Sequence, residues 1–235
     1  MQRPKASLKN ILCDGCTLTA QQGIRINTDA TLTIYAQSIS NDMGKIVATE
    51  TNHDKAAIGG NKNYRAGELV IHSGNIEASC NDGSKYAAGI GGGYGDGSGM
   101  KAITIYSGKV TVQGALYGAG IGGGENGDGG TTIIDGGNIT ATGKFSGPGI
   151  GCGSTNNPPH GRKSGTVTIN GGTVVATGSV ADGNTYSGAG IGTGHNGTIE
   201  KIYNLRTAHG IRLTVAASVE SQRLPDYIYI MVERS

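Results

Sequence analysis

The sequence predicts an all-β protein, a right-handed parallel β-helix built from five to six coils. A Gly-rich stretch recurs along the chain, most completely as GAGIGGG at residues 118–124, and its central isoleucines are 32, 31, 29 and 41 residues apart. Each repeat also contains two short segments in which apolar and polar residues alternate. Self-similarity at a period of roughly 20–50 residues is typical of solenoids, propellers and arrays. The central isoleucines are Ile58, Ile90, Ile121, Ile150 and Ile191.

Each repeat of about 30 residues is expected to supply three short strands. In one repeat these are ITI at 103–105, VTV at 110–112 after a Ser-Gly turn, and the Gly-rich stretch at 118–124. Stacked coils lie about 4.8 Å apart, so inward residues should form ladders of like side chains. A propeller needs four longer strands in each blade, which these short segments do not provide. One predicted ladder is Ile71, Ile105, Ile134 and Ile169.

The chain divides into three parts of one continuous domain. Residues 1–28 precede the regular repeats and are expected to form an irregular first coil that acts as a cap. Residues 29–194 carry the repeats, and residues 195–235 depart from the pattern. In that last part, 199–205, 211–215 and 227–232 have the alternation of strands and should complete the rod.

Composition limits the classes of function. The 44 glycines fall at fixed places in each repeat, which indicates turns and close backbone approach rather than a linker. A net charge of +2 argues against nucleic-acid binding. No apolar run reaches 18 residues, so no membrane insertion is expected. Residues 1–20 lack the apolar core of a signal peptide, which suggests a mature form or a piece of a longer surface protein.

The four cysteines give a weak signal. Cys13 and Cys16 have the Cys-x-x-Cys spacing that serves a disulfide, a metal or redox chemistry. A zinc site needs two further ligands, and the remaining cysteines, Cys80 and Cys152, do not form a second pair. We therefore expect an incidental role or a local disulfide.

The alternation of GAGIGGG-like stretches with ITIxGGxVTATG-like stretches resembles a known type of repeat. It is similar to the Gly-rich right-handed β-helix repeats of bacterial surface proteins that are described as carbohydrate-binding-domain-containing. The resemblance covers residues 29–194. It implies the solenoid fold and a surface location, and it supplies no catalytic residues.

An aromatic column is the strongest candidate for a binding site. Four aromatic residues each lie four or five positions before a repeat isoleucine, so stacking of the coils should align them along one edge. Exposed aromatic faces suit sugar rings, because the C–H groups of the sugar pack on the π-system. Stacking of the rings on one another is the alternative, and both roles can coexist. The residues are Tyr86, Tyr117, Phe145 and Tyr186.

The acidic Gly-rich loops offer two weaker hypotheses. Asp96, Glu125 and Asp128 resemble calcium-binding Gly-Asp repeats, although these loops recur once per coil rather than every nine residues. Asp96 and Asp128 are also the one carboxylate pair in facing loops that the alternative of a polysaccharide-cleaving enzyme would use. Asp-Gly is also a common turn sequence, which explains these loops without a bound ion. We therefore expect no cofactor, with calcium as the weaker alternative.

Another column follows the first strand of each repeat and consists of His72, Tyr106, Asp135 and Asn170. His72 and Asp135 are two coils apart, about 10 Å, which is too far for direct proton exchange. We therefore expect these residues to cap turns.

These observations favour a non-catalytic extracellular or cell-surface module that binds a polysaccharide, or a host partner as an adhesin, along one face. The alternatives are a polysaccharide lyase or glycoside hydrolase with a groove across the coils, and a structural stalk or spacer. An ice-binding surface ranks last, because strict Thr-x-Thr ladders are lacking.

Overall fold

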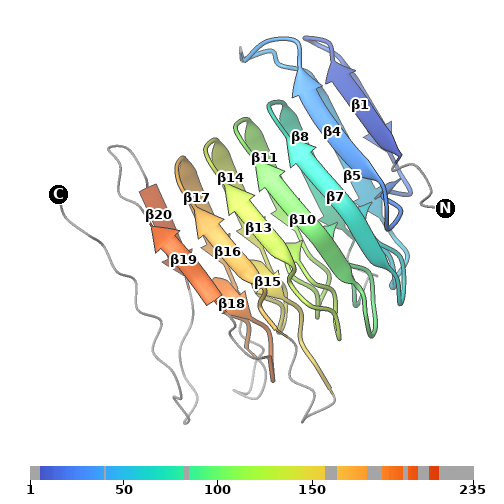
Figure 1. The fold of residues 1–235 in the computed structure, drawn as a ribbon, viewed down its shortest axis with the longest axis vertical. Helices are drawn as coiled ribbons and strands as arrows, with labels where there is room; N and C mark the ends of the chain where they lie inside the picture. The colour runs from blue at the N-terminus through green and yellow to red at the C-terminus, as the bar shows by residue number, and fades with distance from the viewer. Residues whose placement is uncertain are drawn as a thin grey trace.

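The computed structural model is an all-β parallel solenoid, which confirms the fold class predicted from the repeats (Figure 1). It describes residues 6–39, 41–81, 85–156, 163–178, 187–197, 201–205 and 212–216. Twenty strands lie in these ranges, and every third strand along the chain joins the same parallel sheet. Strands β1 to β18 therefore make six successive coils, and β19 and β20 extend two of the sheets.

Three sheets run along the solenoid, and we call them A, B and C. Sheet A contains β1 (Ser7–Leu12), β4 (Thr31–Ala36), β7 (Arg65–Ile71), β10 (Gly99–Ile105), β13 (Thr131–Ile134), β16 (Thr166–Ile169) and β19 (Lys201–Leu205). Sheet B contains β2 (Thr17–Ala20), β5 (Lys45–Glu50), β8 (Asn75–Cys80), β11 (Lys109–Gln113), β14 (Asn138–Thr142), β17 (Thr173–Thr177) and β20 (Arg212–Ala216). Sheet C contains β3 (Ile24–Arg25), β6 (Ile58–Gly59), β9 (Ile90–Gly91), β12 (Ile121–Gly122), β15 (Ile150–Cys152) and β18 (Ile191–Thr193).

The strands pair in register from coil to coil, so inward side chains meet their counterparts directly. In sheet A, Ile71 pairs with Ile105, which pairs with Ile134. In sheet C, the predicted ladder of central isoleucines is confirmed. Four of its members are fully buried, namely Ile58, Ile90, Ile121 and Ile150. Burying one such side chain contributes about 1.5–3 kcal/mol, so these ladders form the core of the rod.

The regularity extends to the N-terminal end of the described chain, whereas near the C-terminal end the register between β16 and β19 shifts after Thr168. Residues 7–25, expected as an irregular cap, supply β1, β2 and β3, which pair in register with the next coil. The inward positions Leu8 and Leu18 are 64% and 43% exposed because no preceding coil covers them in the described chain. The strands predicted at 199–205 and 211–215 form as β19 and β20, whereas 227–232 lies outside the described residues.

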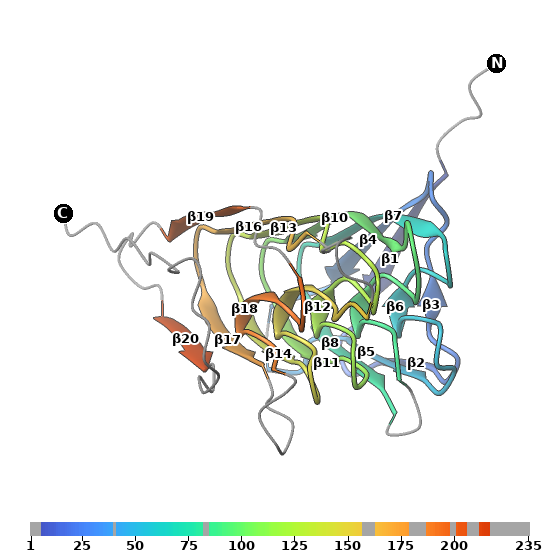
Figure 2. The same cartoon turned by 90° about the horizontal axis from the view of Figure 1, so that it is seen from below.

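Sheet C forms the third side of each coil, and in Figure 2 its short strands are seen with sheet A above them and sheet B below. From β7 to β17, tight turns join sheet A to sheet B, whereas longer loops lead from sheet B into sheet C and from sheet C to the next strand of sheet A. The first two coils differ, because residues 37–44 separate β4 from β5 and only residues 21–23 separate β2 from β3. These two loops meet over sheet C: the backbone N–H of Tyr94 donates to Asp54, and that of Glu125 donates to Tyr86. The strands of sheet C from β6 to β15 are consequently buried on both faces, and the loops carry the exposed side chains.

The second residue of each sheet C strand from β6 onward is a glycine for a steric reason. Gly122 has a φ of +130°, and a Cβ at this position would lie 2.0 Å from the carbonyl oxygen of Gly151 in the next coil. Gly91 has the same relation to Gly122, at 1.8 Å. Any side chain here would force neighbouring coils apart at the centre of the rod.

We predict that Gly122→Ala destabilises the protein by about 3 kcal/mol or more, because backbone strain and steric overlap add together. Gly97→Ala is the matched control: Gly97 has a φ of +73°, but no atom lies within 4 Å of its would-be Cβ. That variant should lose only about 1–2 kcal/mol from backbone strain. Denaturant unfolding measures both values, and equal losses would contradict the steric explanation.

Candidate ligand-binding site

The aromatic column predicted from the sequence is present in part. Tyr86 stacks on Tyr117 with ring centroids 6.0 Å apart, and Tyr117 meets Phe145 edge to face at 5.4 Å. Tyr186, the fourth predicted member, lies outside the described residues. The structure thus brings together three of the four candidates, in the loops that enter sheet C.

The rings of this column largely cover one another. Tyr86 also lies 4.6 Å from Tyr94, centroid to centroid, and 6.2 Å from the ring of His53. The ammonium of Lys62 lies 4.9 Å from the centre of the Tyr94 ring. All three predicted residues are half-buried. This geometry favours the stacking role, because a sugar needs a free aromatic face and most faces here already have partners.

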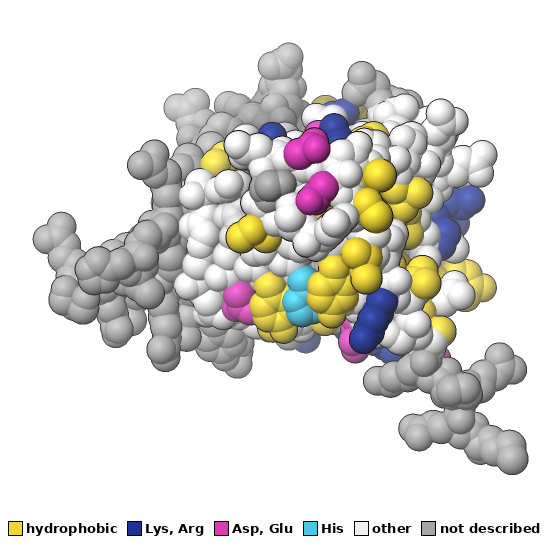
Figure 3. Space-filling view, turned by 90° about the horizontal axis from the view of Figure 1, so that it is seen from above, with side chains coloured by type: hydrophobic (Ala, Val, Ile, Leu, Met, Phe, Trp, Pro, Cys, Tyr) yellow, Lys and Arg dark blue, Asp and Glu magenta, His cyan; other side chains and the backbone are white. Residues whose placement is uncertain are grey.

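A second aromatic column lies at the ends of the sheet A strands. His72 is stacked between Tyr35 and Tyr106, with ring centroids 4.4 Å and 4.7 Å away. Figure 3 shows this face as a row of hydrophobic and histidine side chains that ends at an acidic one. Asp135 and Asn170 continue it through a 2.7 Å hydrogen bond from the amide to the carboxylate. Tyr106 separates His72 from Asp135, as expected, and Tyr35 is the member that the sequence analysis missed.

The three acidic candidates have different environments. Asp96 and Asp128 are exposed, and Asp128 accepts a 3.1 Å hydrogen bond from the backbone N–H of Lys163 in the next coil. Glu125 is 1% exposed. Within the described ranges, no three His, Cys, Asp or Glu side chains are grouped so that they could hold a metal ion.

Glu125 is a buried carboxyl group with an incomplete set of partners. Its Oε1 accepts a hydrogen bond from Asn156, whereas its Oε2 is buried and has no hydrogen-bond partner. Burial raises the pKa of Glu125 to about 7, and the hydrogen bond from Asn156 only partly opposes this shift. The protonated form is therefore the one that suits the folded protein.

We predict that Glu125 makes the protein less stable as the pH rises. Between about pH 4.5 and 7 the folded state keeps a proton that the unfolded state has released, so deprotonation favours unfolding. This stabilising contribution is complete below pH 4.5 and is lost once the pH has passed 7. Glu125→Gln should therefore melt higher than the wild type at pH 8, with a smaller difference at pH 5.

The comparison is best made as a difference between variants, because burial lowers the pKa of His195 and acts in the opposite direction with pH. Glu68→Gln, at a half-buried glutamate on sheet A, is the matched control. Thermal melting followed by circular dichroism gives the midpoints. If the difference in midpoint between Glu125→Gln and the wild type is the same at pH 5 and pH 8, the prediction is contradicted.

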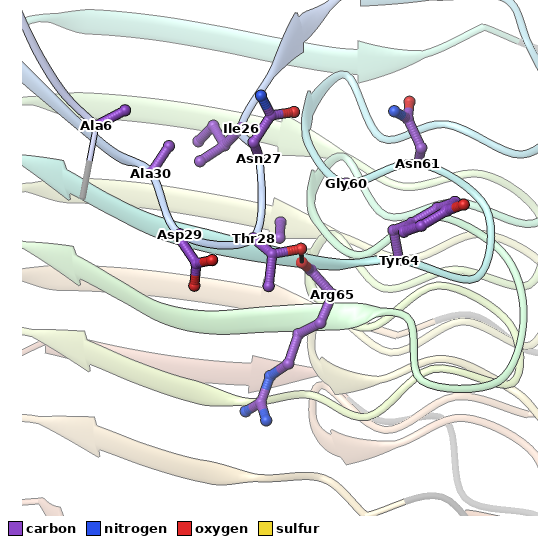
Figure 4. Close-up of a pocket in the computed structure, with 11 residues that line it drawn as sticks. Ala6, Ile26, Asn27, Thr28, Asp29, Ala30, Gly60, Asn61, Tyr64 and Arg65 are labelled. Atoms are coloured by element: carbon purple, nitrogen blue, oxygen red, sulfur yellow. Dashed lines mark hydrogen bonds between the residues drawn. The ribbon is translucent and has the colours of Figure 1, made fainter. Parts of the chain in front are cut away.

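A pocket of about 480 Å³ lies at the corner between sheets C and A, near the N-terminal end of the solenoid. Its walls are the loop from Ile26 to Ala30 and the loop from Gly60 to Ala66, with Ala6 at one side (Figure 4). These are successive loops at equivalent places, one after β3 and one after β6. The pocket therefore lies between neighbouring coils.

Several polar groups line this pocket. The amide oxygen of Asn61 is buried and has no hydrogen-bond partner. Thr28 ties the two loops together, because its hydroxyl donates a 2.7 Å hydrogen bond to the backbone oxygen of Arg65. Asp29 is exposed and pairs with Lys101 at 3.0 Å. The pocket thus has polar walls, and the hydrogen bond from Thr28 to Arg65 holds its two loops together.

Tyr64 supplies an exposed aromatic ring at the same pocket, with 69% of its surface accessible. Figure 4 shows its side chain to one side of the polar residues. Its ring takes part in no aromatic contact among the described residues, unlike those of Tyr86 and Tyr117. Tyr64 lies outside the repeated positions, and the one signal in the sequence was that loop 61–65 has no glycine where later coils are Gly-rich.

A buried ion pair supports the pocket from the adjacent wall. Arg25 pairs with Glu50, which is 3% exposed, and also donates to the backbone oxygen of Gly60 at 3.3 Å. Burial lowers the pKa of Arg25, and the Glu50 carboxylate opposes that shift. Removing one partner of such a pair leaves an uncompensated buried charge, so this contact holds β3 and β6 in place.

The Cys-x-x-Cys motif forms the turn between β1 and β2. The backbone N–H of Cys16 donates to the carbonyl of Cys13 at 3.1 Å, and both exposed thiols are free rather than joined in a disulfide. Cys80 and Cys152 are buried, and burial raises the pKa of Cys80 to about 12. Cys80 is therefore a core residue rather than a nucleophile.

The fold and its register define a parallel β-solenoid. Four segments of the chain match the family model described as beta helix repeat, at residues 69–94, 103–125, 133–154 and 167–195. The chain therefore carries beta helix repeats, a description that names an architecture and not a ligand. Searches of curated proteins and of solved structures gave no match. In the part of the chain that the structure describes, no helix is long and apolar enough to cross a membrane.

Proposed function

We propose that this solenoid is a non-catalytic module that binds a saccharide in the pocket between loops 26–30 and 60–66. The observation that carries the proposal is the exposed ring of Tyr64 at a pocket lined by polar side chains, among them the carboxylate of Asp29. The predicted column of Tyr86, Tyr117 and Phe145 supports the proposal less well, because its rings stack on one another.

The chemistry of the pocket suits a sugar. A pyranose ring presents C–H groups on one face, which pack against an aromatic ring, and hydroxyl groups at its edge. The hydroxyl groups donate to acceptors such as the exposed Asp29 carboxylate. A cavity of about 480 Å³ is within the usual size of small-molecule sites.

Binding suits the geometry better than cleavage. Glycoside hydrolysis generally uses two carboxyl groups on opposite sides of the scissile bond. The residues that line the pocket include one, Asp29, and its carboxylate pairs with Lys101 at 3.0 Å. A saccharide ligand also accords with the extracellular or cell-surface setting expected from the sequence.

We predict that Tyr64→Ala weakens saccharide binding about ten-fold or more, because the variant loses both ring stacking and buried apolar area. The measurement is native affinity electrophoresis through gels that contain a panel of polysaccharides. The panel should include acidic and neutral polymers, since the proposal concerns saccharides as a class. The polymer that retards the wild type most then serves for titration of the variant.

Tyr106→Ala is the matched control, because Tyr106 is also an exposed tyrosine, at 46%, but belongs to the column on sheet A. It should be retarded as strongly as the wild type. If Tyr64→Ala and the wild type are retarded equally, the binding site lies elsewhere on the solenoid and the proposed pocket is wrong. If no polymer retards the wild type, the proposal fails and a structural spacer becomes the better explanation.

A further inference from the structure

Two charged side chains line the pocket, Asp29 and Arg65, and two further ion pairs lie near it. Asp29 pairs with Lys101 at 3.0 Å, Asp54 with Lys62 at 3.2 Å, and Glu50 with Arg25. Arg65, which lines the pocket, is exposed, and its guanidinium has no hydrogen bond or ion pair within the described ranges. The site therefore carries one surplus positive charge on a side chain that is free to bind a ligand.

We infer that the ligand of this pocket is an acidic saccharide whose carboxylate binds Arg65, an inference that rests on the proposed saccharide site. A guanidinium group is planar and donates two parallel hydrogen bonds to a carboxylate, which gives both affinity and orientation. The ion pair between Asp29 and Lys101 offsets the charge of the acidic residue in the same wall. A uronic acid therefore meets a net positive site.

The positions of the side chains also suggest the length of the ligand. In Figure 4, Tyr64 and Asn61 lie together at one end of the pocket, Asp29 lies toward the other end, and Arg65 extends away between them. A ring that stacks on Tyr64 does not direct its own carboxylate and its hydroxyl groups to all of these residues at once. An oligosaccharide of acidic sugars fits this spread better than a single sugar.

Polygalacturonate and its methyl-esterified form provide the test, because the two polymers share a sugar backbone and differ in charge. The wild type should bind the acid form at least about ten-fold more tightly than the ester, since a charged hydrogen-bonded pair is lost in the ester. Added salt should weaken binding of the acid form, because the pair is exposed and screened. Alginate, with other uronic acids, reports whether carboxylate charge or this particular ring is recognised.

Arg65→Gln should lose the preference for the acid form, and Arg65→Lys should recover only part of it, because lysine keeps the charge without the planar fork. Lys109→Gln is the matched control: it removes one positive charge from an exposed residue on sheet B, away from the pocket. That variant should bind as the wild type does. The melting midpoint of each variant should equal that of the wild type. A loss of binding is then due to the missing side-chain contact and not to unfolding.

Three other results would overturn the inference, and they are distinguishable. If a neutral polymer binds and Arg65→Gln leaves its affinity unchanged while Tyr64→Ala removes it, the saccharide site stands and its preference for acidic ligands is refuted. If neither charged nor neutral polymers bind the wild type, the inference falls together with the proposed function. Equal losses in Arg65→Gln and Lys109→Gln would show attraction by overall charge rather than by this pocket.

Discussion

The close approach of successive coils at sheet C is the constraint on which the rest of the structure depends. The peptide of Gly122 leaves room for a hydrogen atom only, since a Cβ would lie 2.0 Å from the backbone of the next coil. This contact lets the isoleucines of sheet C fill the space between sheets A and B. It also draws the flanking loops together over the outside of the sheet. Larger residues at these positions would increase the spacing between coils and so disturb the strand pairing in all three sheets.

The candidate site exists because one loop departs from this regularity. In later coils the loops that leave sheet C are rich in glycine and pack tightly on their neighbours. Residues 61–65 replace glycine with larger polar and aromatic residues, and Tyr64 and Arg65 extend from the rod as a result. Strands fix the position of each loop, while the sequence of the loop is under less steric control. Binding residues are commonly found on loops of this kind.

The sequence was sufficient to predict the sheets and insufficient to predict the site. The repeats allowed the strands to be predicted, because Ile71, Ile105 and Ile134 occupy equivalent positions and must pair if the coils stack. Tyr35 was also within reach of the sequence, because it follows Ile34 as His72 follows its register partner Ile71. The Tyr64 pocket and the burial of Glu125 depend on how particular loops fold back across neighbouring coils. No periodic signal records that, since each of these residues differs from its counterparts in other coils. Patterns therefore reveal what recurs, and this site depends on what does not.

The in-register pairing of the coils has a consequence for how such a chain can change in length. Each strand bonds only to the same strand of the coils before and after it. Gain or loss of one whole coil would thus leave every remaining pair intact, whereas insertion of a single residue within a strand would turn the following side chains to the opposite face. Duplication of complete units is the route by which this architecture lengthens, and a pocket near one end would keep its form while the rod behind it grew.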